Sequence, residues 1–484
     1  MMFERQHQHP ALILLSLIQS LKEMLIPIIF LIYSALKDDT SQWWPLIGFF
    51  ALILFVLTSS FLRWLRFYYD VTEREVRIEY GIFTRKRRYI PFERIQTINL
   101  TQGIIHRMFG LVKLQIETAG SGDEPEAQLQ ALSRDKAERL REWIRAQKEK
   151  SNIDAFIEEK DKKEQLNEEI DYEFKLSKKT LIIAASTSGG FGVLFSFIGA
   201  LFTQIDNLLP ENFFSGMLDA LISLSIFFIV IAIFFVALIA WLVSIVNTVF
   251  KFGGFVLKKK RDELQIERGI LEKRQVTIPI NKVQAVRIEE GLFRQPFQLA
   301  AIYVDIAGES GSESDLSTVI NPLIHKKDVM AFLNHVLPTF AQEIPFQSVP
   351  KRSRRRYIIR STWFYIPLIG AAFWFLPKQF AIASLLLLLF GIVSGWLKHR
   401  DAGWFLKERT IGVRFRRWGR TTVLTHKKRI QSFEKDESFL QRRKKLATFH
   451  ISVLGGLFGN TFTVQDMELE KADDLFHQLR RKRI

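Results

Sequence analysis

Long apolar segments alternate along this 484-residue chain with stretches in which polar and apolar residues are regularly interspersed. Six segments each hold about 20 or more largely apolar residues, the helix length that crosses a hydrocarbon core of roughly 30 Å. They are Ala11–Leu36, Trp44–Leu62, Leu181–Phe202, a stretch within Phe213–Phe250, Ile358–Leu376 and Phe380–Leu397. Because short connections join them in pairs, the pattern predicts three transmembrane hairpins.

Two adjacent charged residues, Lys22 and Glu23, interrupt the first apolar segment. A charge inside the hydrocarbon is costly unless it is paired or faces other helices. We therefore expect a true span, with a helix lying in the membrane interface as the alternative. Asp219 is the third candidate for a charged residue within the membrane.

After each predicted hairpin, the apolar period changes from that of a helix to that of a strand. Val76 and Ile78 alternate with charged residues, and Leu264 and Ile266 alternate with polar ones at the matching place in the second region. A period of two is typical of half-buried strands in an antiparallel sheet. Each region then ends in one amphipathic helical pattern, which favours a small curled sheet or barrel capped by that helix. The apolar positions assigned to the three helices are Leu129, Leu132, Leu140, Trp143 and Ile144; Val329, Phe332, Leu333 and Val336; and Ala472, Leu475, Phe476 and Leu479.

The three soluble regions share landmarks at fixed spacings. One such landmark is a glutamine (Gln96, Gln284 and Gln431) that follows an apolar residue, itself preceded by a basic one. The distances between these glutamines also carry Gly120 onto Gly308 and Gly455. Such self-similarity indicates one unit that is repeated three times. Turns and backbone hydrogen bonds are the first explanation for these residues. An exposed contact on the sheet or its rim is the alternative for the three glutamines.

We therefore predict an α+β membrane protein in which each transmembrane hairpin is followed by a soluble antiparallel module with a C-terminal helix. The predicted boundaries are 11–63 for the first hairpin, 64–146 for the first module, 147–177 for a charged linker, 178–250 for the second hairpin, 251–340 for the second module, 341–356 for a basic linker, 357–397 for the third hairpin and 398–484 for a divergent third module.

The distribution of charge predicts the orientation in the membrane. The chain has 48% hydrophobic and 25% charged residues and a formal charge of +17, so charge and apolarity must be segregated along it. The connections inside the hairpins hold almost no Lys or Arg, whereas basic residues follow each hairpin. The positive-inside rule therefore puts both termini and all three modules in the cytoplasm of a plasma-membrane protein. The absence of cysteine fits a reducing compartment.

Four basic clusters on the predicted cytoplasmic side are candidate contacts for the anionic leaflet or for an acidic partner. Such runs gain about 1 kcal/mol per Lys or Arg near an anionic membrane. A topology signal or a solvated turn is the plainer explanation. The candidate residues are Arg85, Lys86, Arg87 and Arg88; Lys258, Lys259, Lys260 and Arg261; Arg352, Arg354, Arg355 and Arg356; and Arg442 and Arg443.

No motif for catalysis, cofactor binding or metal binding is present. The chain lacks HExxH, a phosphate-binding loop, a GxSxG elbow and paired cysteines, and its histidines do not cluster in sequence. We therefore predict a protein that is not an enzyme and that has no catalytic residues, no cofactor and no metal. The basic charge would attract nucleic acid, but no recognition helix or stacking motif accompanies it, so a nucleic-acid partner is not expected.

Several of these landmarks resemble a known family. The runs Ile90-Pro91, Arg94-Ile95-Gln96, Phe109-Gly110-Leu111 and Ala119-Gly120 are similar to the bacterial pleckstrin-homology-like (PH-like) domain bPH2, once catalogued as domain of unknown function 304. The whole arrangement resembles Gram-positive membrane proteins that carry three such domains, each behind a transmembrane pair. The resemblance implies a barrel-like antiparallel sheet capped by a helix. The third module departs from the pattern, because His426 and Lys444 replace a proline and a phenylalanine.

Three functions fit this organisation. The first is a non-enzymatic membrane scaffold whose three modules assemble with a partner membrane protein, such as a smaller relative with one module, since tandem weak sites gain avidity. The second is a transporter or lipid-handling protein that uses the six-helix region. The third is support of membrane integrity or of resistance to membrane-active peptides, which is compatible with the first. Alanine at Lys22 and Glu23 separates the second function from the others.

Overall fold

The computed structural model describes residues 3–24, 27–28, 44–72, 74–82, 84–118, 126–153, 170–187, 226–306, 318–342, 345–407, 409–454 and 460–480. The chain divides into two compact units, which are described separately. The first unit contains Met1–Glu169 together with Leu271–Thr277 from the second repeat, and most of the remaining chain forms the second unit. Gly120, Gly308, Gly455 and Asp219 lie outside the described residues.

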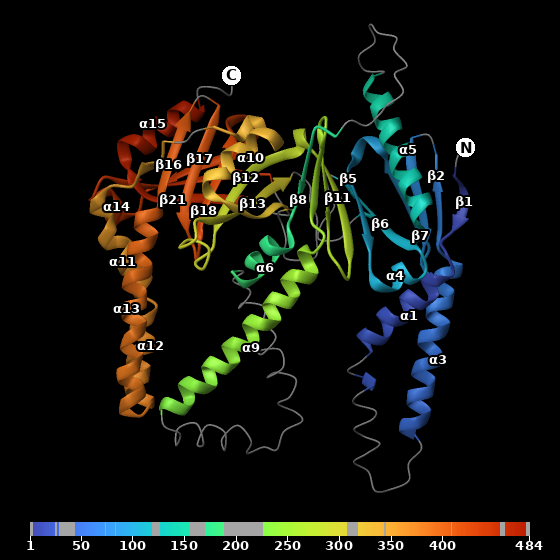
Figure 1. The fold of residues 1–484 in the computed structure, drawn as a ribbon, viewed down its shortest axis with the longest axis horizontal. Coiled ribbons are helices and arrows are strands. Elements are labelled where there is room, and N and C mark those ends of the chain that lie inside the picture. The colour runs from blue at the N-terminus through green and yellow to red at the C-terminus, as the bar shows by residue number, and fades with distance from the viewer. Residues whose placement is uncertain are drawn as a thin grey trace. The chain divides into compact units, whose positions relative to one another are not determined.

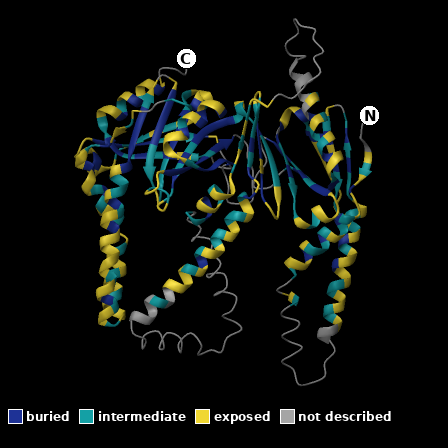
Figure 2. Cartoon of the chain, in the orientation of Figure 1, coloured by how far each residue is buried: buried dark blue, intermediate teal, exposed yellow. Residues whose placement is uncertain are grey.

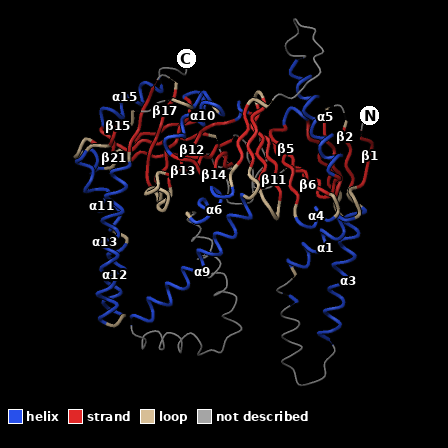
Figure 3. Tube along the Cα trace, viewed as in Figure 1, coloured by secondary structure: helices blue, strands red, loops and turns tan. Residues whose placement is uncertain are grey.

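In the first unit, the described strands belong to two antiparallel sheets, and helices accompany them (Figures 1 and 3). One sheet has the order β1 (Phe3–His7), β2 (Tyr68–Val71), β3 (Glu75–Tyr80), β4 (Lys86–Pro91). The other contains β5 (Ile95–Gln102), β6 (Leu111–Thr118) and β7 (Ala127–Ser133), and helices α4 (Ile104–Met108) and α5 (Arg134–Ile153) accompany it. Buried side chains from both sheets and from α5 form one core, which includes Val76, Ile90, Leu114, Leu129 and Leu140.

The helical assignment of Leu129 and Leu132 was wrong, because both residues lie in β7. Leu129 is buried between the half-buried Gln128 and Gln130, which is the strand period. The helix begins only at Arg134. The spacing of three between the two leucines imitates a helical period because the pairing of β7 with β6 is irregular there: Leu132 lies opposite Val112 and Leu129 opposite Leu114, so three residue steps in β7 match two in β6.

The second unit carries the second and third repeats. The second repeat contains β8 (Tyr172–Lys175), α6 (Lys178–Ser186), α9 (Ile226–Phe252), β9 (Val256–Lys260), β10 (Glu263–Arg268), β12 (Val283–Glu290), β13 (Leu299–Ile306), β14 (Thr318–His325) and α10 (Val329–Val336). The third contains β15 (Gln347–Ser348), α11 (Arg354–Thr362), α12 (Tyr365–Phe375), α13 (Lys378–Asp401), β16 (Gly403–Lys407), β17 (Thr410–Arg416), β18 (Arg420–His426), β19 (Ile430–Asp436), α14 (Phe439–Arg442), β20 (Leu446–Val453), β21 (Asn460–Glu468) and α15 (Leu469–Arg480). The sheets have the orders β14-β13-β12-β18-β17-β16-β15 and β19-β20-β21.

Each predicted hairpin lies between two paired strands, and the sequence-based boundaries did not include the first strand of each pair. In the first repeat, His7 of β1 lies opposite Tyr68 of β2. In the second, β8 pairs with β9, and in the third, β15 pairs with β16. Strands β8 and β15 fall in the two segments that the sequence analysis assigned to linkers. The chain therefore leaves a sheet before each predicted hairpin and returns after it to the neighbouring strand of the same sheet.

Four of the described helical stretches are long and apolar enough to cross a membrane. They are Ile47–Leu65, Phe234–Phe252, Lys351–Phe375 and Lys378–Asp401. Figure 2 shows exposed residues along α3 (Trp44–Leu65), α9, α12 and α13, as expected for helices that face lipid. The predicted first and third spans are described only in part, through α1 (Ala11–Glu23) and α6. The described helices therefore correspond to four of the six predicted spans.

Two glycines bring the helices of the third hairpin close together. A β-carbon added at Gly395 of α13 would lie 2.6 Å from the Cα atom of Ile358 in α11, and one at Gly391 would lie 2.9 Å from the Thr362 side chain. Small residues spaced by four allow helix backbones to approach in a membrane. Between α11 and α12, Pro367 removes the N–H that would bond the carbonyl of Trp363, and the helix is interrupted there.

Candidate functional site

The repeats are joined by strand addition from one repeat to the previous one. In the first unit, residues of β11 (Lys273–Pro279), which belongs to the second repeat by sequence, pair with β5. In the second unit, β18 of the third repeat pairs antiparallel with β12 of the second over six residue pairs. The third strand after a hairpin thus binds the edge of the sheet that belongs to the preceding repeat.

Both junctions have the same register. Leu100 of β5 lies opposite Gln275, and Ile288 of β12 lies opposite Thr422. The spacing that carries Gln96 onto Gln284 also carries Leu100 onto Ile288. Likewise, the spacing from Gln284 to Gln431 carries Gln275 onto Thr422. Because a slip of one residue would turn every side chain to the other face of the sheet, equal registers indicate one mode of binding used twice.

Side chains reinforce the junction between the second and third repeats. Arg420 of β18 pairs with Glu290 of β12, which is 3% exposed. Arg416 donates to the buried Asp401 at 2.5 Å and to Gln295 at 2.6 Å, so the end of α13 belongs to the same network. Thr425 donates its hydroxyl to the backbone carbonyl of Gln284 at 2.8 Å. Fully partnered polar groups at a buried junction fix its geometry.

The three recurring glutamines occupy a β-bulge in their repeats. In β12, Val283 pairs with Ile306 and Ala285 with Asp305, so that Gln284 is the extra residue between them. The same irregularity occurs at Gln96 and at Gln431. The Gln284 side chain is 4% exposed and donates to the carbonyl of Lys282 at 2.9 Å. A bulge bends its strand, so these residues shape the sheet beside each junction.

A buried carboxyl group faces the bulge in two repeats. Glu117 lies opposite Thr97 and accepts a hydrogen bond of 2.6 Å from its hydroxyl, and burial raises the pKa of Glu117. At the matching position in the second repeat, burial raises the pKa of Asp305 to about 6, and Arg287 lies 3.1 Å away. The third repeat has Ser452 at this position. The sequence analysis missed these acids because each occurs singly within an apolar strand.

The first predicted basic cluster is partly paired within the first unit. Glu79 lies 2.5 Å from Arg85 and 3.1 Å from Arg87, and the hydrogen bond from Arg85 lowers the pKa of the Glu79 carboxyl. Arg88 donates to the backbone carbonyl of Glu126. Lys86 is exposed. Lys86, Arg87 and Arg88 begin β4, which is the edge strand of its sheet, and Arg85 directly precedes it.

In the other three clusters, some basic side chains contact groups of the same unit and others are exposed. Lys259 donates to the carbonyl of His335 at 2.8 Å, whereas Arg261 is exposed in a turn with a φ of 43°. Lys258 and Lys260 are half-buried in β9. Arg352 lies 3.2 Å from Glu468, and Arg356 lies 3.0 Å from Asp466, which is fully buried. The side chains that remain exposed in these clusters are Arg261, Arg354, Arg355, Arg442 and Arg443, besides Arg352 itself.

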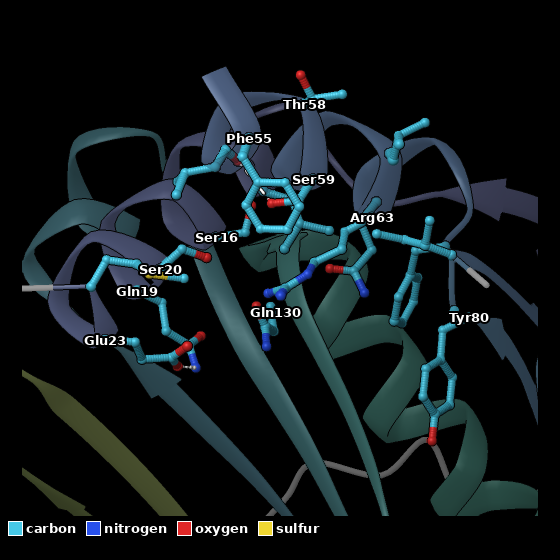
Figure 4. A pocket seen from close by; sticks show the side chains of 18 residues that line it. Ser16, Gln19, Ser20, Glu23, Phe55, Thr58, Ser59, Arg63, Tyr80 and Gln130 are labelled. Atoms are coloured by element: carbon cyan, nitrogen blue, oxygen red, sulfur yellow. Dashed lines mark hydrogen bonds between the residues drawn. The ribbon is translucent and has the colours of Figure 1, made fainter. Parts of the chain in front are cut away.

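A cavity of about 580 Å³ lies between α1, α3 and the sheets of the first unit. Figure 4 shows Gln19, Ser20 and Glu23 of α1 on one wall and Arg63 and Gln130 nearer the middle. Gln19 donates to Glu23 at 3.3 Å. The predicted intramembrane residue Glu23 therefore lines a cavity. Lys22 is exposed and does not line it.

In each repeat, an exposed apolar side chain lies in the connection that follows β5, β12 or β19. Met108 of α4 is 78% exposed, Phe297 is 64% exposed, and Phe439 of α14 is 72% exposed. Sequence periodicity missed them because they lie outside the long strands and helices. Exposed apolar groups beside basic residues are typical of surfaces that touch lipid or protein. Among the described residues, no group of three or more His, Cys, Asp or Glu side chains could hold a metal.

Comparison with known proteins agrees with this arrangement of antiparallel sheets and apolar helices, which defines a membrane protein built on PH-like domains. The Bacterial PH domain family matches three segments, residues 15–148, 211–339 and 364–483, so the chain belongs to this family. It is 35% identical over 482 residues to the UPF0699 transmembrane protein YdbT of Bacillus subtilis (strain 168), covering 98% of this chain and 97% of that protein. It is also 33% identical over 76 residues to the UPF0699 transmembrane protein YdbS of the same organism, covering 16% of this chain and 45% of that protein. No solved structure matches.

Proposed function

We propose that this protein is a non-enzymatic plasma-membrane scaffold whose three cytoplasmic PH-like domains assemble with a partner membrane protein. The β12–β18 junction carries this proposal, because it is a PH-like sheet that binds a strand of another repeat through backbone pairing and buried ion pairs. Strand addition of this kind is a general mode of protein recognition. A domain that binds its neighbour in this way can bind a related domain of another chain.

The insertion of each hairpin between paired strands supports the proposed topology. His7 and Tyr68 are partners in one sheet, as are Lys175 with Val256 and Ser348 with Gly403. A hairpin that starts and ends at neighbouring strands must return to the side of the membrane from which it left. This constraint favours two crossings per hairpin and therefore six spans. It also favours one membrane side for all the domains, which the basic residues after each hairpin assign to the cytoplasm.

Exposed basic side chains support a contact between the domains and the anionic leaflet. Arg354 and Arg355 stand at the start of α11, where the third hairpin begins, and both are exposed. Arg442 and Arg443 are exposed at the end of α14, beside the exposed ring of Phe439. Each such cation near an anionic surface contributes about 1 kcal/mol. Domains held against the lipid in this way would support membrane integrity, including under attack by membrane-active peptides.

The partner that fits this scaffold is a smaller membrane protein with one PH-like domain. Such a protein offers the same strand edges as the repeats of this chain. Because all the repeats share one tether, several weak contacts would act at high effective concentration.

Purification of the tagged full-length protein from its own membranes in mild detergent tests the proposal. We expect mass spectrometry to find one membrane protein in a fixed ratio to the chain. We also expect that protein to be lost when the bait lacks the soluble domains but retains the hairpins. Recovery of one enriched lipid class without any protein partner would contradict the scaffold.

The cavity of the first unit favours lipid handling as a second candidate function. Its lining combines apolar side chains such as Leu12 and Phe55 with Glu23 and Arg63, which suits a headgroup and part of an acyl chain. Substitution of Arg63→Ala should then reduce co-purified phospholipid, measured by mass spectrometry per mole of protein. Lys22→Gln is the matched control, because Lys22 lies on the same helix as Glu23 but outside the lining. Equal lipid content in both variants would exclude this function for the cavity.

A further inference from the structure

In each junction between repeats, one strand (the donor) adds to the edge strand of the preceding repeat (the acceptor). One strand of the donor kind and one edge of the acceptor kind take part in neither junction. The donors β11 and β18 are the third strands after their hairpins, and β4 is their counterpart in the first repeat. The acceptors β5 and β12 have β19 as their counterpart in the third repeat. Strand β4 is an edge of β1-β2-β3-β4, and β19 is an edge of β19-β20-β21, so neither edge is paired further within the described part of the chain.

The register of the two occupied junctions predicts how these free edges would meet. The repeat spacings carry Arg420 of β18 onto Arg85 and Glu290 of β12 onto Glu437. Arg420 and Glu290 are partners in the occupied junction. The same pair of residue types, an arginine and a glutamate, therefore occurs at the matching place beside the open edges, with Arg85 directly before β4 and Glu437 directly after β19.

Charges along the two edges are complementary in that register. Lys86 would lie opposite Asp436, and Arg88 opposite Glu434. Opposite charges that face each other across strands stabilise the pairing. One pair has like charges, Arg87 opposite Lys435. Each already has an acidic partner in its own unit: Arg87 lies 3.1 Å from Glu79, which also contacts Arg85, and Lys435 lies 2.5 Å from Asp473 and 2.9 Å from Glu437.

Aromatic contacts and exposure agree with this pairing. The ring of Tyr89 is 53% exposed and would face the half-buried Phe433. Glu434 and Asp436 are exposed, as are Lys86 and Arg88. Exposed edge strands are normally covered or protected by charge. Two β4 edges repel each other because both are basic, so the charges select the pairing of β4 with β19 over the pairing of β4 with itself.

We infer that β4 of one copy of this chain adds to β19 of a second copy, so that the protein assembles head to tail in the membrane. This inference rests on the proposed scaffold function and names a second copy as the occupant of its free edges. The contact joins two different surfaces, so it continues from copy to copy until a row ends or closes into a ring. Each added copy would extend the series of strand junctions already present within one chain.

Cysteine cross-linking tests the register directly, because the natural chain contains no cysteine. In Lys86→Cys/Asp436→Cys, the two sulfur atoms would face each other across the new junction. Oxidation in isolated membranes should then give a ladder of dimers and larger species on a denaturing gel. The matched control is Lys86→Cys/Ser432→Cys, in which the second cysteine is about 14 Å away along β19. We expect no ladder from this control or from either single variant.

A charge exchange tests the predicted Arg85–Glu437 pair. Arg85→Glu or Glu437→Arg alone should lower the co-purification of two differently tagged copies about tenfold, which corresponds to roughly 1.4 kcal/mol. The double variant Arg85→Glu/Glu437→Arg restores opposite charges and should recover most of the association. Such recovery also shows that the single variants fold.

Three results would overturn the inference. They are a ladder of equal strength from the out-of-register control, a cross-link confined to a single chain, and capture of a different protein by the cysteine at position 86. Failure of self-association is distinguishable from failure of the scaffold function. If the wild-type chain still retains a partner protein in the purification described above, the scaffold stands and only the second-copy occupant is lost.

Discussion

Arg420 of β18 forms a two-point ion pair with Glu290 of β12, in which Nε of the arginine lies 2.8 Å from Oε1 of the glutamate. This pair joins the third repeat to the second at the end of their shared sheet. The arginine side chain is 21% exposed and the carboxylate 4% exposed, so water screens the pair only weakly.

Removal of this arginine should destabilise the second unit. Arg420→Ala leaves Glu290 buried without its main partner, which we expect to cost about 3 kcal/mol. Thermal unfolding of the full-length protein in detergent should show a clearly lower midpoint. Lys428→Ala is the control, because Lys428 is exposed in the same repeat and should change the midpoint little. Equal effects of the two substitutions would show that the ion pair does not hold the junction.

Close packing of the third hairpin should make Gly395 intolerant of a side chain. In Gly395→Ala the new methyl group would lie 2.6 Å from the Cα atom of Ile358 and 2.8 Å from the Tyr357 carbonyl oxygen. The helices must then separate, at a cost of about 1–3 kcal/mol. Gly370→Ala is the matched control, because nothing lies within 4 Å of its added β-carbon. We expect size-exclusion chromatography after heating to show more aggregated protein for the first variant alone.

The buried Asp305 should make stability depend on pH. Its pKa rises from 3.8 to about 6, chiefly because burial disfavours the charged form. A raised folded-state pKa contributes stability that is complete below pH ~4 and is lost as the pH rises through about 6. Asp305→Asn removes this loss, so the variant should gain up to about 3 kcal/mol over the wild type between pH 4 and pH 7.

Unfolding midpoints at pH 4.5 and 7.5 check this prediction. The control is Glu267→Gln, because Glu267 is exposed in the same repeat. Arg287 keeps a second partner in Asp305→Asn, since Glu289 lies 3.4 Å from it. If Asp305→Asn shows the same pH dependence of stability as the wild type, groups other than Asp305 cause that dependence.

The bulge glutamines should differ in importance although their sequence context is the same. Gln284 is 4% exposed and donates to the Lys282 carbonyl, so Gln284→Ala should cost about 1–2 kcal/mol. Gln431 is exposed, so Gln431→Ala should cost less. Urea denaturation of the two variants in the same detergent compares them. A larger effect at Gln431 would favour the alternative that this glutamine makes a functional contact.

Sequence patterns predicted several strands because alternation is visible within a few residues, and they predicted the repeats because the same landmarks recur along the chain. The alternation at Val76 and Ile78 marks β3, and the matching pattern at Leu264 and Ile266 marks β10. The membership of the bacterial PH domain family was also predicted from the landmark residues and is confirmed. The strand signals depend on residues only a few positions apart, and the landmarks keep their residue types from one repeat to the next.

The strands before the hairpins were missed because they are too short to show a period. Strand β15 contains only Gln347 and Ser348, and it is recognisable only because Gly403 and Trp404 pair with it. The pairing partner follows a long helical hairpin, so no local pattern contains both strands. The same argument holds for β1 and β8.

Charge alone could not predict which residues of the basic clusters form ion pairs within the protein and which remain exposed. Arg356 looks like its neighbours in sequence, yet it binds the fully buried Asp466, which lies far away in the chain. Arg354 and Arg355 remain exposed. Which member of a cluster is structural depends on the position of an acid in another element, and one sequence does not reveal that position.

The mass of the particle released from native membranes tests the scaffold most directly. The full-length protein is extracted in mild detergent without added cross-linker and measured by native mass spectrometry. The mass should exceed that of one chain by one or more whole copies of a PH-domain membrane protein, which is either the partner or a second copy of this chain. A mass that corresponds to one chain with bound lipid, under conditions that preserve a control membrane complex, would contradict the account.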